Sequence, residues 1–336
     1  MSTGLSGLVI VAAIGGLLIA SHAEARGRSS FTSSNGALEQ GYSAYKNGNY
    51  ALAEQALGYA SEHGSLLGKY YLSRIYSGTD TSFVNHARAY KLLYEIVKDN
   101  AARIDVDDDP MALYVGKSLT ALGLYWLHGL PELGIQSTPQ RAASYFQEAA
   151  TFFLDHDAQF ELAKLYWAGK GVREDKRQAV HWFWSLSQRG HAGAQAFLAD
   201  LHWRGDYLPR DPITALALIT VATENAPASE RVWIEAIYQK IYCGMSERQR
   251  QQAETAIVKF RKRFAPPPGT APVENRDLRT SPSLTCADGL PLPIPRYPPR
   301  RRSDDRQAIM QSMPLGEGYS SNLLDGKGLL DVRERR

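Results

Sequence analysis

Histidine and acidic side chains are the first to consider for chemistry, because they bind metals. His181, His191 and His202 are ten and eleven residues apart, whereas two ligands on one face of a helix lie three or four residues apart. The acidic segment 105–110, DVDDDP, lacks the glycine and the distant glutamate of a calcium-binding loop. We therefore expect no metal site, and no pattern in the chain indicates a cofactor.

The familiar catalytic motifs are also missing from the sequence. The chain contains no Gly-x-Ser-x-Gly, no His-Glu-x-x-His and no cysteine with a base positioned beside it. Residues 115–118, VGKS, are similar to the end of a phosphate-binding loop, but Met111 stands where that loop needs glycine. We therefore predict that the protein is not an enzyme.

Positive and negative charges are balanced over most of the chain. The net charge is +3 over 336 residues, and residues 37–264 contain 25 Lys and Arg residues and 25 Asp and Glu residues. Nucleic-acid-binding proteins carry a basic surface. DNA and RNA are therefore poor candidates for partners.

A repeat of 36 residues is the strongest pattern in the chain. Two copies begin at Ala158 and Ala194, and each contains two stretches whose apolar residues recur at spacings of three and four, typical of one face of a helix. The matched positions are Leu165 with Leu201, Gly169 with Gly205, Asp175 with Asp211, and Ala179 with Ala215. Each copy is therefore predicted to be a pair of helices.

The loop inside each copy carries the residues that a tight helix–helix connection needs. Gly169 and Gly171 can adopt backbone angles denied to other residues, and Asp175 and Asp211 are predicted to cap the second helix. Tyr207 stands where the second copy should have the counterpart of Gly171. These residues turn and cap the chain, and they need no ligand to explain them.

Weaker copies extend the series in both directions. They predict an all-α solenoid of about six antiparallel helix pairs over residues 37–264, in which each pair buries its apolar face on its neighbours. Ala179, Ala194 and Ala215 are expected to be the small residues between packed helices. The repeat therefore gives the protein its shape, and that shape presents a surface.

Aromatic residues near the ends of the first helices are the candidates for binding a partner. Most of the 18 Tyr and 6 Trp residues are expected to pack between helix pairs. Residues just beside the packing stripe of a solenoid line its concave face, and Tyr and Trp are frequent in binding hot spots. The candidates are Tyr125, Trp167 and Trp203.

The two ends of the chain differ from the middle. Residues 1–25 hold an apolar run followed by Ala23-Glu24-Ala25, which predicts a cleaved signal peptide, with a retained membrane anchor as the alternative. Residues 26–36 are predicted to be a flexible linker. Residues 265–336 form a proline-rich, basic tail that is predicted to be disordered, since ten of the 17 prolines lie between 265 and 299.

The chain has two cysteines, Cys243 and Cys286. In an oxidising compartment they fit a disulfide that would tie the tail to the last repeat. Two separate thiols, with Cys243 buried in a helix, fit equally well, because the pairing of two residues cannot be deduced from sequence.

The loop motif of the unit at 158–190, G-x-G-V-x-x-D with Ala four residues after the Asp, resembles the Sel-one-like repeat, a relative of the tetratricopeptide repeat. A second resemblance covers residues 41–253, on segments such as GNYALAEQALGYASEHG and RGHAGAQAFLADL. These segments resemble the ExoR type of exopolysaccharide-production negative regulator of α-proteobacteria.

This second resemblance implies a periplasmic protein that restrains a membrane sensor histidine kinase, in two-component signalling, through the outer domain of that kinase. The predicted secretory signal agrees with it. We therefore expect a periplasmic, non-enzymatic negative regulator of exopolysaccharide production, which reaches the membrane only through its partner unless the signal segment is retained. The alternative is an envelope scaffold that organises a polysaccharide or peptidoglycan enzyme.

Overall fold

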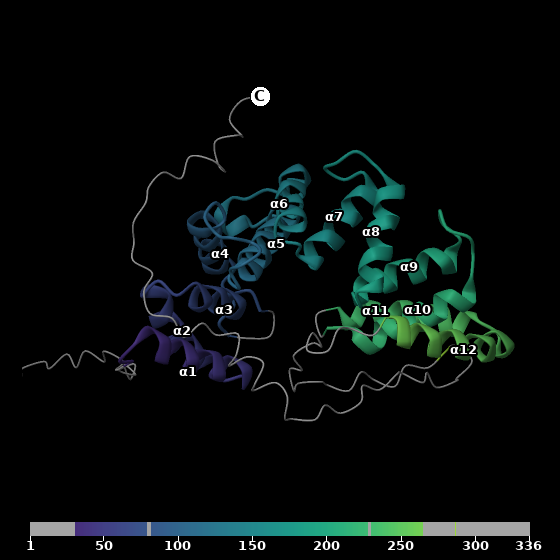
Figure 1. Cartoon of the computed structure of the whole chain (residues 1–336), viewed down its shortest axis with the longest axis horizontal. Helices are drawn as coiled ribbons and strands as arrows, with labels where there is room; N and C mark the ends of the chain where they lie inside the picture. Colours follow the sequence, from purple (N-terminus) through teal and green to yellow (C-terminus); the bar gives the residue numbers. More distant parts are fainter. Residues whose placement is uncertain (1–30, 79–81, 228–229, 265–285, 287–336) are drawn as a thin grey trace, which may run out of the picture. The chain divides into compact units, whose positions relative to one another are not determined.

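The computed structural model describes residues 31–78, 82–227, 230–264 and 286. The predicted signal peptide, residues 26–30 of the predicted linker and the tail other than Cys286 lie outside these residues. The described part contains twelve α-helices, one 3-10 turn and no β-strand (Figure 1). The helices are α1 (Ser34–Lys46), α2 (Tyr50–Glu62), α3 (Leu66–Tyr76), α4 (His86–Asn100), α5 (Ala112–His128), α6 (Pro139–Thr151), α7 (His156–Ala168), α8 (Lys176–Gln188), α9 (Ala192–Arg204), α10 (Pro212–Asn225), α11 (Arg231–Gly244) and α12 (Glu247–Arg263).

The helices follow one another as six consecutive pairs along the chain. Each helix from α1 to α10 packs against the next one, whereas α12 packs mainly against α10. We call the odd-numbered helices A helices and the even-numbered ones B helices. The expected all-α solenoid of helix pairs is confirmed. Its first helix begins at Ser34, inside the predicted flexible linker, because the hydroxyl of Ser33 accepts a hydrogen bond from the backbone N–H of Gly36 and caps the first turn.

Side-chain caps define where most helices begin. Asp175 and Asp211 cap α8 and α10 through their carboxylates, as the repeat pattern predicts. Thr138, before α6, differs, because its hydroxyl donates to the carbonyl of Gln136 instead of capping the helix. Pro139 follows at the first helical position, where a missing N–H costs no hydrogen bond.

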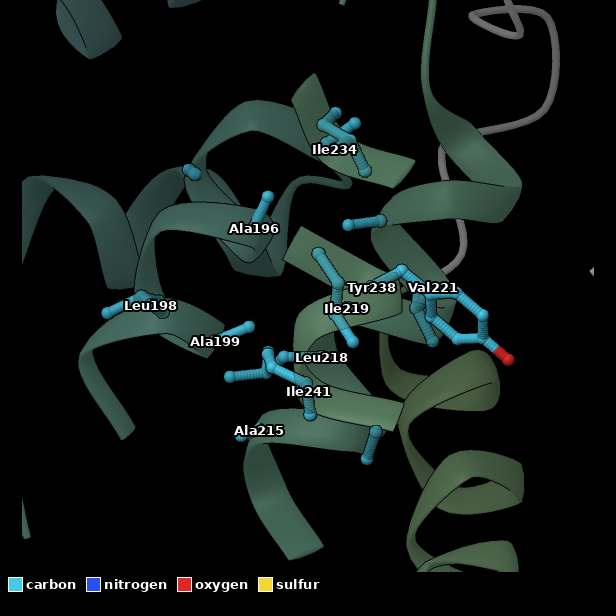
Figure 2. Packing of buried hydrophobic residues seen from close by; sticks show 14 of the residues in the cluster. Ala196, Leu198, Ala199, Ala215, Leu218, Ile219, Val221, Ile234, Tyr238 and Ile241 are labelled. Carbon is cyan, nitrogen blue, oxygen red and sulfur yellow. The ribbon is translucent and has the colours of Figure 1, made fainter. Parts of the chain in front are cut away.

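Alanines make the close contact between neighbouring pairs. The B helices of the first five pairs have a fully buried alanine four residues after the cap position: Ala53, Ala89, Ala142, Ala179 and Ala215. Ala158 and Ala194 are buried in the A helices in the same way. Figure 2 shows this packing at the C-terminal end of the series, where Ala199 and Ala215 lie among Leu198, Leu218 and Ile241.

Replacing these alanines should destabilise the protein. Ala179→Phe and Ala194→Phe each introduce a ring where the native side chain is fully buried, and overpacking of this kind costs about 1–3 kcal/mol. Thermal unfolding followed by circular dichroism should show a lower midpoint for both variants. An unchanged midpoint for both would contradict the packing between helix pairs.

The structure joins the two cysteines. Cys243, near the end of α11, forms a disulfide with Cys286, and their Cα atoms are 5.4 Å apart. Cys286 is buried in the same apolar cluster as Met245 and Phe264. Of the two arrangements that the sequence allowed, the structure has the one that ties a tail residue to the last helix pair.

Candidate partner-binding site

A series of aromatic rings, each with a cation over it, follows the loops between the A and B helices. In every one of the last five pairs, an aromatic residue in the final turns of the A helix lies under a basic residue near the start of the B helix. The distances from the cation to the ring centroid are 5.7 Å for Arg88 over Tyr76, 3.8 Å for Arg141 over Trp126, 5.0 Å for Lys176 over Trp167, 5.6 Å for Arg210 over Trp203 and 4.4 Å for Arg250 over Tyr242. We call this the aromatic–cation series.

The loop geometry repeats along with this series. In three of the loops the residue that caps the B helix donates its backbone N–H to a carbonyl near the end of the preceding A helix. The bonds run from Asn85 to Tyr76, from Asp175 to Tyr166 and from Asp211 to His202. This bond fixes the start of the B helix beside the end of the A helix. In these three loops the cation is therefore held near an aromatic ring, a contact that contributes about 0.5–1 kcal/mol at exposed sites.

Trp167 and Trp203, which the sequence predicts as binding residues, are both members of the series and both half-buried. The ring of Trp167 meets Phe197 and Tyr207 edge to face, at 5.7 and 5.9 Å between centroids. Trp203 packs closely on Gly244 in α11, where a Cβ atom would lie 2.5 Å from the indole. Each of the two rings is therefore partly packed against neighbouring side chains and partly exposed on the surface.

Tyr125, the third predicted residue, lies in a different environment. Its hydroxyl is 3.1 Å from Nδ1 of His86, and its ring meets His86 and Tyr90 edge to face. Burial raises the pKa of its phenol to about 12. The structure gives Tyr125 a packing role between pairs, and Trp126 takes the position in the series.

Sequence reasoning missed Trp126, although the signal was present. The triplet Leu124-Tyr125-Trp126 aligns with Leu165-Tyr166-Trp167 and with Leu201-His202-Trp203. In that alignment Trp126 matches Trp167 and Trp203, whereas Tyr125 matches Tyr166 and His202. Equivalent positions of a repeat face the same way, and this alone would have selected Trp126.

A polar cluster links three A helices at their opposite, N-terminal ends. Nζ of Lys117 in α5 is 3.6 Å from a carboxylate oxygen of Asp155 and 3.6 Å from one of Asp157. Nε2 of His191, before α9, is 3.4 Å from Asp157. The surrounding protein would raise the pKa of Asp157, but the hydrogen bond with His191 and the charge of Lys117 lower it below its usual range.

The three histidines considered as metal ligands lie in separate environments. His181 is exposed, His191 accepts a hydrogen bond from the backbone N–H of Ala194, and His202 lies 3.1 Å from the carbonyl of Pro209. Among the described residues, no group of three or more His, Cys, Asp or Glu side chains is arranged to hold a metal ion. None of the described helices is both long and apolar enough to cross a membrane.

Comparison with protein families places a known repeat on the central helices. The family model of the Sel1 repeat matches residues 116–151, 156–191 and 192–225. These segments coincide with the pairs α5–α6, α7–α8 and α9–α10. The chain therefore carries Sel1 repeats, as its loop motif predicts.

Two relatives share the greater part of the chain. Both are named "Exopolysaccharide production negative regulator". The one from Rhizobium meliloti (strain 1021) is 29% identical over 216 residues, which are 64% of this chain and 77% of that protein. The one from Rhizobium leguminosarum bv. viciae is 28% identical over 214 residues, 63% of this chain and 77% of that protein.

Solved structures share the fold. A Sel1 repeat protein from Oxalobacter formigenes has a TM-score of 0.50 and 23% identity, over 67% of this chain and 85% of that one. The protective antigen c5321 of uropathogenic Escherichia coli, described as displaying an SLR fold, has a TM-score of 0.51 and 22% identity, over 69% of this chain and 46% of that one. At this level of identity the likeness shows the Sel1-repeat solenoid alone.

Proposed function

We propose that this Sel1-repeat protein is a non-enzymatic regulator that binds another protein and thereby lowers exopolysaccharide production. The aromatic–cation series is the observation that carries the proposal. It places an aromatic ring under a cation beside the loop of five successive helix pairs, and Trp126, Trp167 and Trp203 occupy equivalent repeat positions. Aromatic and arginine side chains dominate binding hot spots in protein interfaces. The two relatives named as negative regulators support the same function.

The finer part of the proposal concerns the partner and the compartment. We propose that the protein acts in the periplasm and holds a membrane sensor histidine kinase inactive by binding its outer domain. The N-terminal apolar run with Ala23-Glu24-Ala25 supports export. The resemblance to the ExoR type supports the kinase as partner.

Deleting the gene should raise kinase output and increase exopolysaccharide production, because the restraint is removed. Cross-linking in the periplasm should recover the outer domain of the kinase with the wild-type protein. Trp167→Ala and Trp203→Ala should recover less of it, since each removes a ring of the series. Trp233→Ala is the matched control, because Trp233 is also half-buried but lies near the start of α11, at the other end of an A helix.

Two outcomes would contradict the proposal. One is unchanged kinase output after deletion, together with cross-links only to a polysaccharide synthase or a peptidoglycan enzyme, which would favour an envelope scaffold. The other is equal recovery of the kinase by all three tryptophan variants at equal helical content. That result would exclude the aromatic–cation series as the binding surface.

A further inference from the structure

Two residues in the described part adopt a left-handed backbone conformation although they are not glycine: Leu154, with φ of 52°, and Tyr207, with φ of 63°. Both stand where another repeat has glycine. Leu154 corresponds to Gly190 (φ 83°), and Tyr207 corresponds to Gly171 (φ 76°). The Cβ atom of a residue other than glycine is crowded in this conformation, so both residues strain the fold.

Packing does not account for a tyrosine at position 207. Its side chain is 52% exposed, and among the described residues its ring contacts one other ring, that of Trp167, in an edge-to-face arrangement. A strained residue with an exposed side chain is typical of a functional position, because the fold gains little from it. Tyr207 also lies three residues before Arg210, so it connects two consecutive members of the aromatic–cation series.

The segment that follows Trp167, residues 169–177, is basic, whereas the loop of Tyr207 itself carries the exposed Asp206. Lys170, Arg173 and Arg177 are exposed and make no ion pair within the described residues. Of the two acidic residues in the same loop, Asp175 caps α8 and Glu174 is 3.9 Å from Lys176. The loop therefore has more accessible positive than negative charge, although residues 37–264 as a whole are neutral.

We infer that Tyr207, Trp167, Lys170, Arg173 and Arg177 form a docking site for an acidic segment of a partner protein that carries an aromatic or aliphatic side chain. We call these five residues the Tyr207 site. The two rings would contact the apolar side chain, and the three cations would pair with carboxylates, which fixes the orientation of the segment. This inference rests on the proposed function, because it specifies where and how the partner binds.

The first test selects ligands from a phage-displayed library of random twelve-residue peptides on the immobilised full-length protein. Enriched peptides should contain several Asp or Glu residues and at least one Phe, Tyr or Leu. Tyr207→Gly should bind them at least five-fold more weakly, with a thermal midpoint equal to or above that of the wild type, because glycine relieves the strain. Enrichment of basic peptides, or of none, would overturn the inference.

Leu154→Gly is the matched control for Tyr207→Gly. It relieves the same kind of backbone strain and also removes an exposed side chain, which is 61% accessible. It should bind the selected peptides as the wild type does. Equal weakening by both glycine variants would show that backbone flexibility, and not the Tyr207 ring, causes the loss.

Charge reversal tests the basic part of the site. Arg173→Glu combined with Arg177→Glu should weaken binding of the selected peptides at least ten-fold at low salt and less at high salt, because screening shortens the reach of these charges. Lys91→Glu is the control, since Lys91 is exposed on α4 and lies outside the site. Equal effects of the two changes, or competition by soluble polygalacturonate stronger than by the peptides, would overturn the inference. If the gene deletion nevertheless raises kinase output, the proposed function stands and its binding surface lies elsewhere.

Discussion

Gly171→Ala is expected to lower the free energy of unfolding by about 2–5 kcal/mol. Gly171 has φ of 76°, and a Cβ atom there would lie 2.4 Å from the carbonyl carbon of Pro139 and 2.7 Å from the backbone N of Gln140. The left-handed conformation costs alanine about 1–2 kcal/mol, and relieving the overlap costs about 1–3 kcal/mol more. Because backbone atoms at the start of α6 are fixed by the helix, they cannot move aside cheaply.

Gly134→Ala is the control that separates these two costs. Gly134 has φ of 67° but no atom within 4 Å of the position that a Cβ would occupy. Alanine there should cost about 1 kcal/mol, from the backbone conformation alone. Urea unfolding monitored by circular dichroism gives both values. Equal losses for the two variants would mean that the loop after α7 does not approach α6 as closely as the structure shows.

Asp155→Ala should lower the free energy of unfolding by about 2–4 kcal/mol. The Asp155 side chain is 3% exposed, accepts hydrogen bonds from the backbone N–H of Ala158 and from the hydroxyl of Thr120, and faces Lys117. Losing the helix cap costs about 1 kcal/mol, and a hydrogen bond to a charged group contributes about 1.5–3 kcal/mol. The variant removes both contributions and loosens α7 from α5.

Asp155→Asn distinguishes the hydrogen bonds from the charge. Asparagine keeps an oxygen that can cap α7 and accept from Thr120, and it loses only the attraction to Lys117, whose side chain is 36% exposed. Ion pairs with such exposure contribute about 0–1 kcal/mol. We therefore expect asparagine to cost about 1 kcal/mol. Losses of equal size for asparagine and alanine would assign the stability to the charge instead.

The strained backbone at Tyr207 bears on function as well as on stability. Natural proteins retain local strain where activity needs it. Gly171 and Tyr207 occupy equivalent positions of adjacent repeats. A Cβ atom at Gly171 would overlap the backbone of α6, whereas the ring of Tyr207 lies 5.9 Å from the ring of Trp167. The repeat therefore tolerates a large side chain at 207, and this is the place where the basic loop and Trp167 meet.

The sequence by itself determined the helix pairs, their period and most of their caps. Asp175, Asp211 and the alanines at 179, 194 and 215 were identified from spacing alone, and the structure places them as helix caps and fully buried contacts. Such features depend on residues three to eight positions apart in the chain. Local hydrogen bonds and the helical period are therefore sufficient to predict them.

The tertiary structure alone decided which side chains meet across helices. It placed Arg141 over the ring of Trp126, joined Cys243 to Cys286, and brought Lys117 of α5, Asp157 of α7 and His191, the cap of α9, together. It also showed that Gln159 and Gln195, which the pattern left unremarked, donate to the carbonyls of Ala150 and Ser187 at the end of the preceding B helix. These contacts depend on the rotation and spacing of packed helices. One-dimensional periodicity does not specify those quantities, because it identifies the buried face of a helix without identifying what lies opposite.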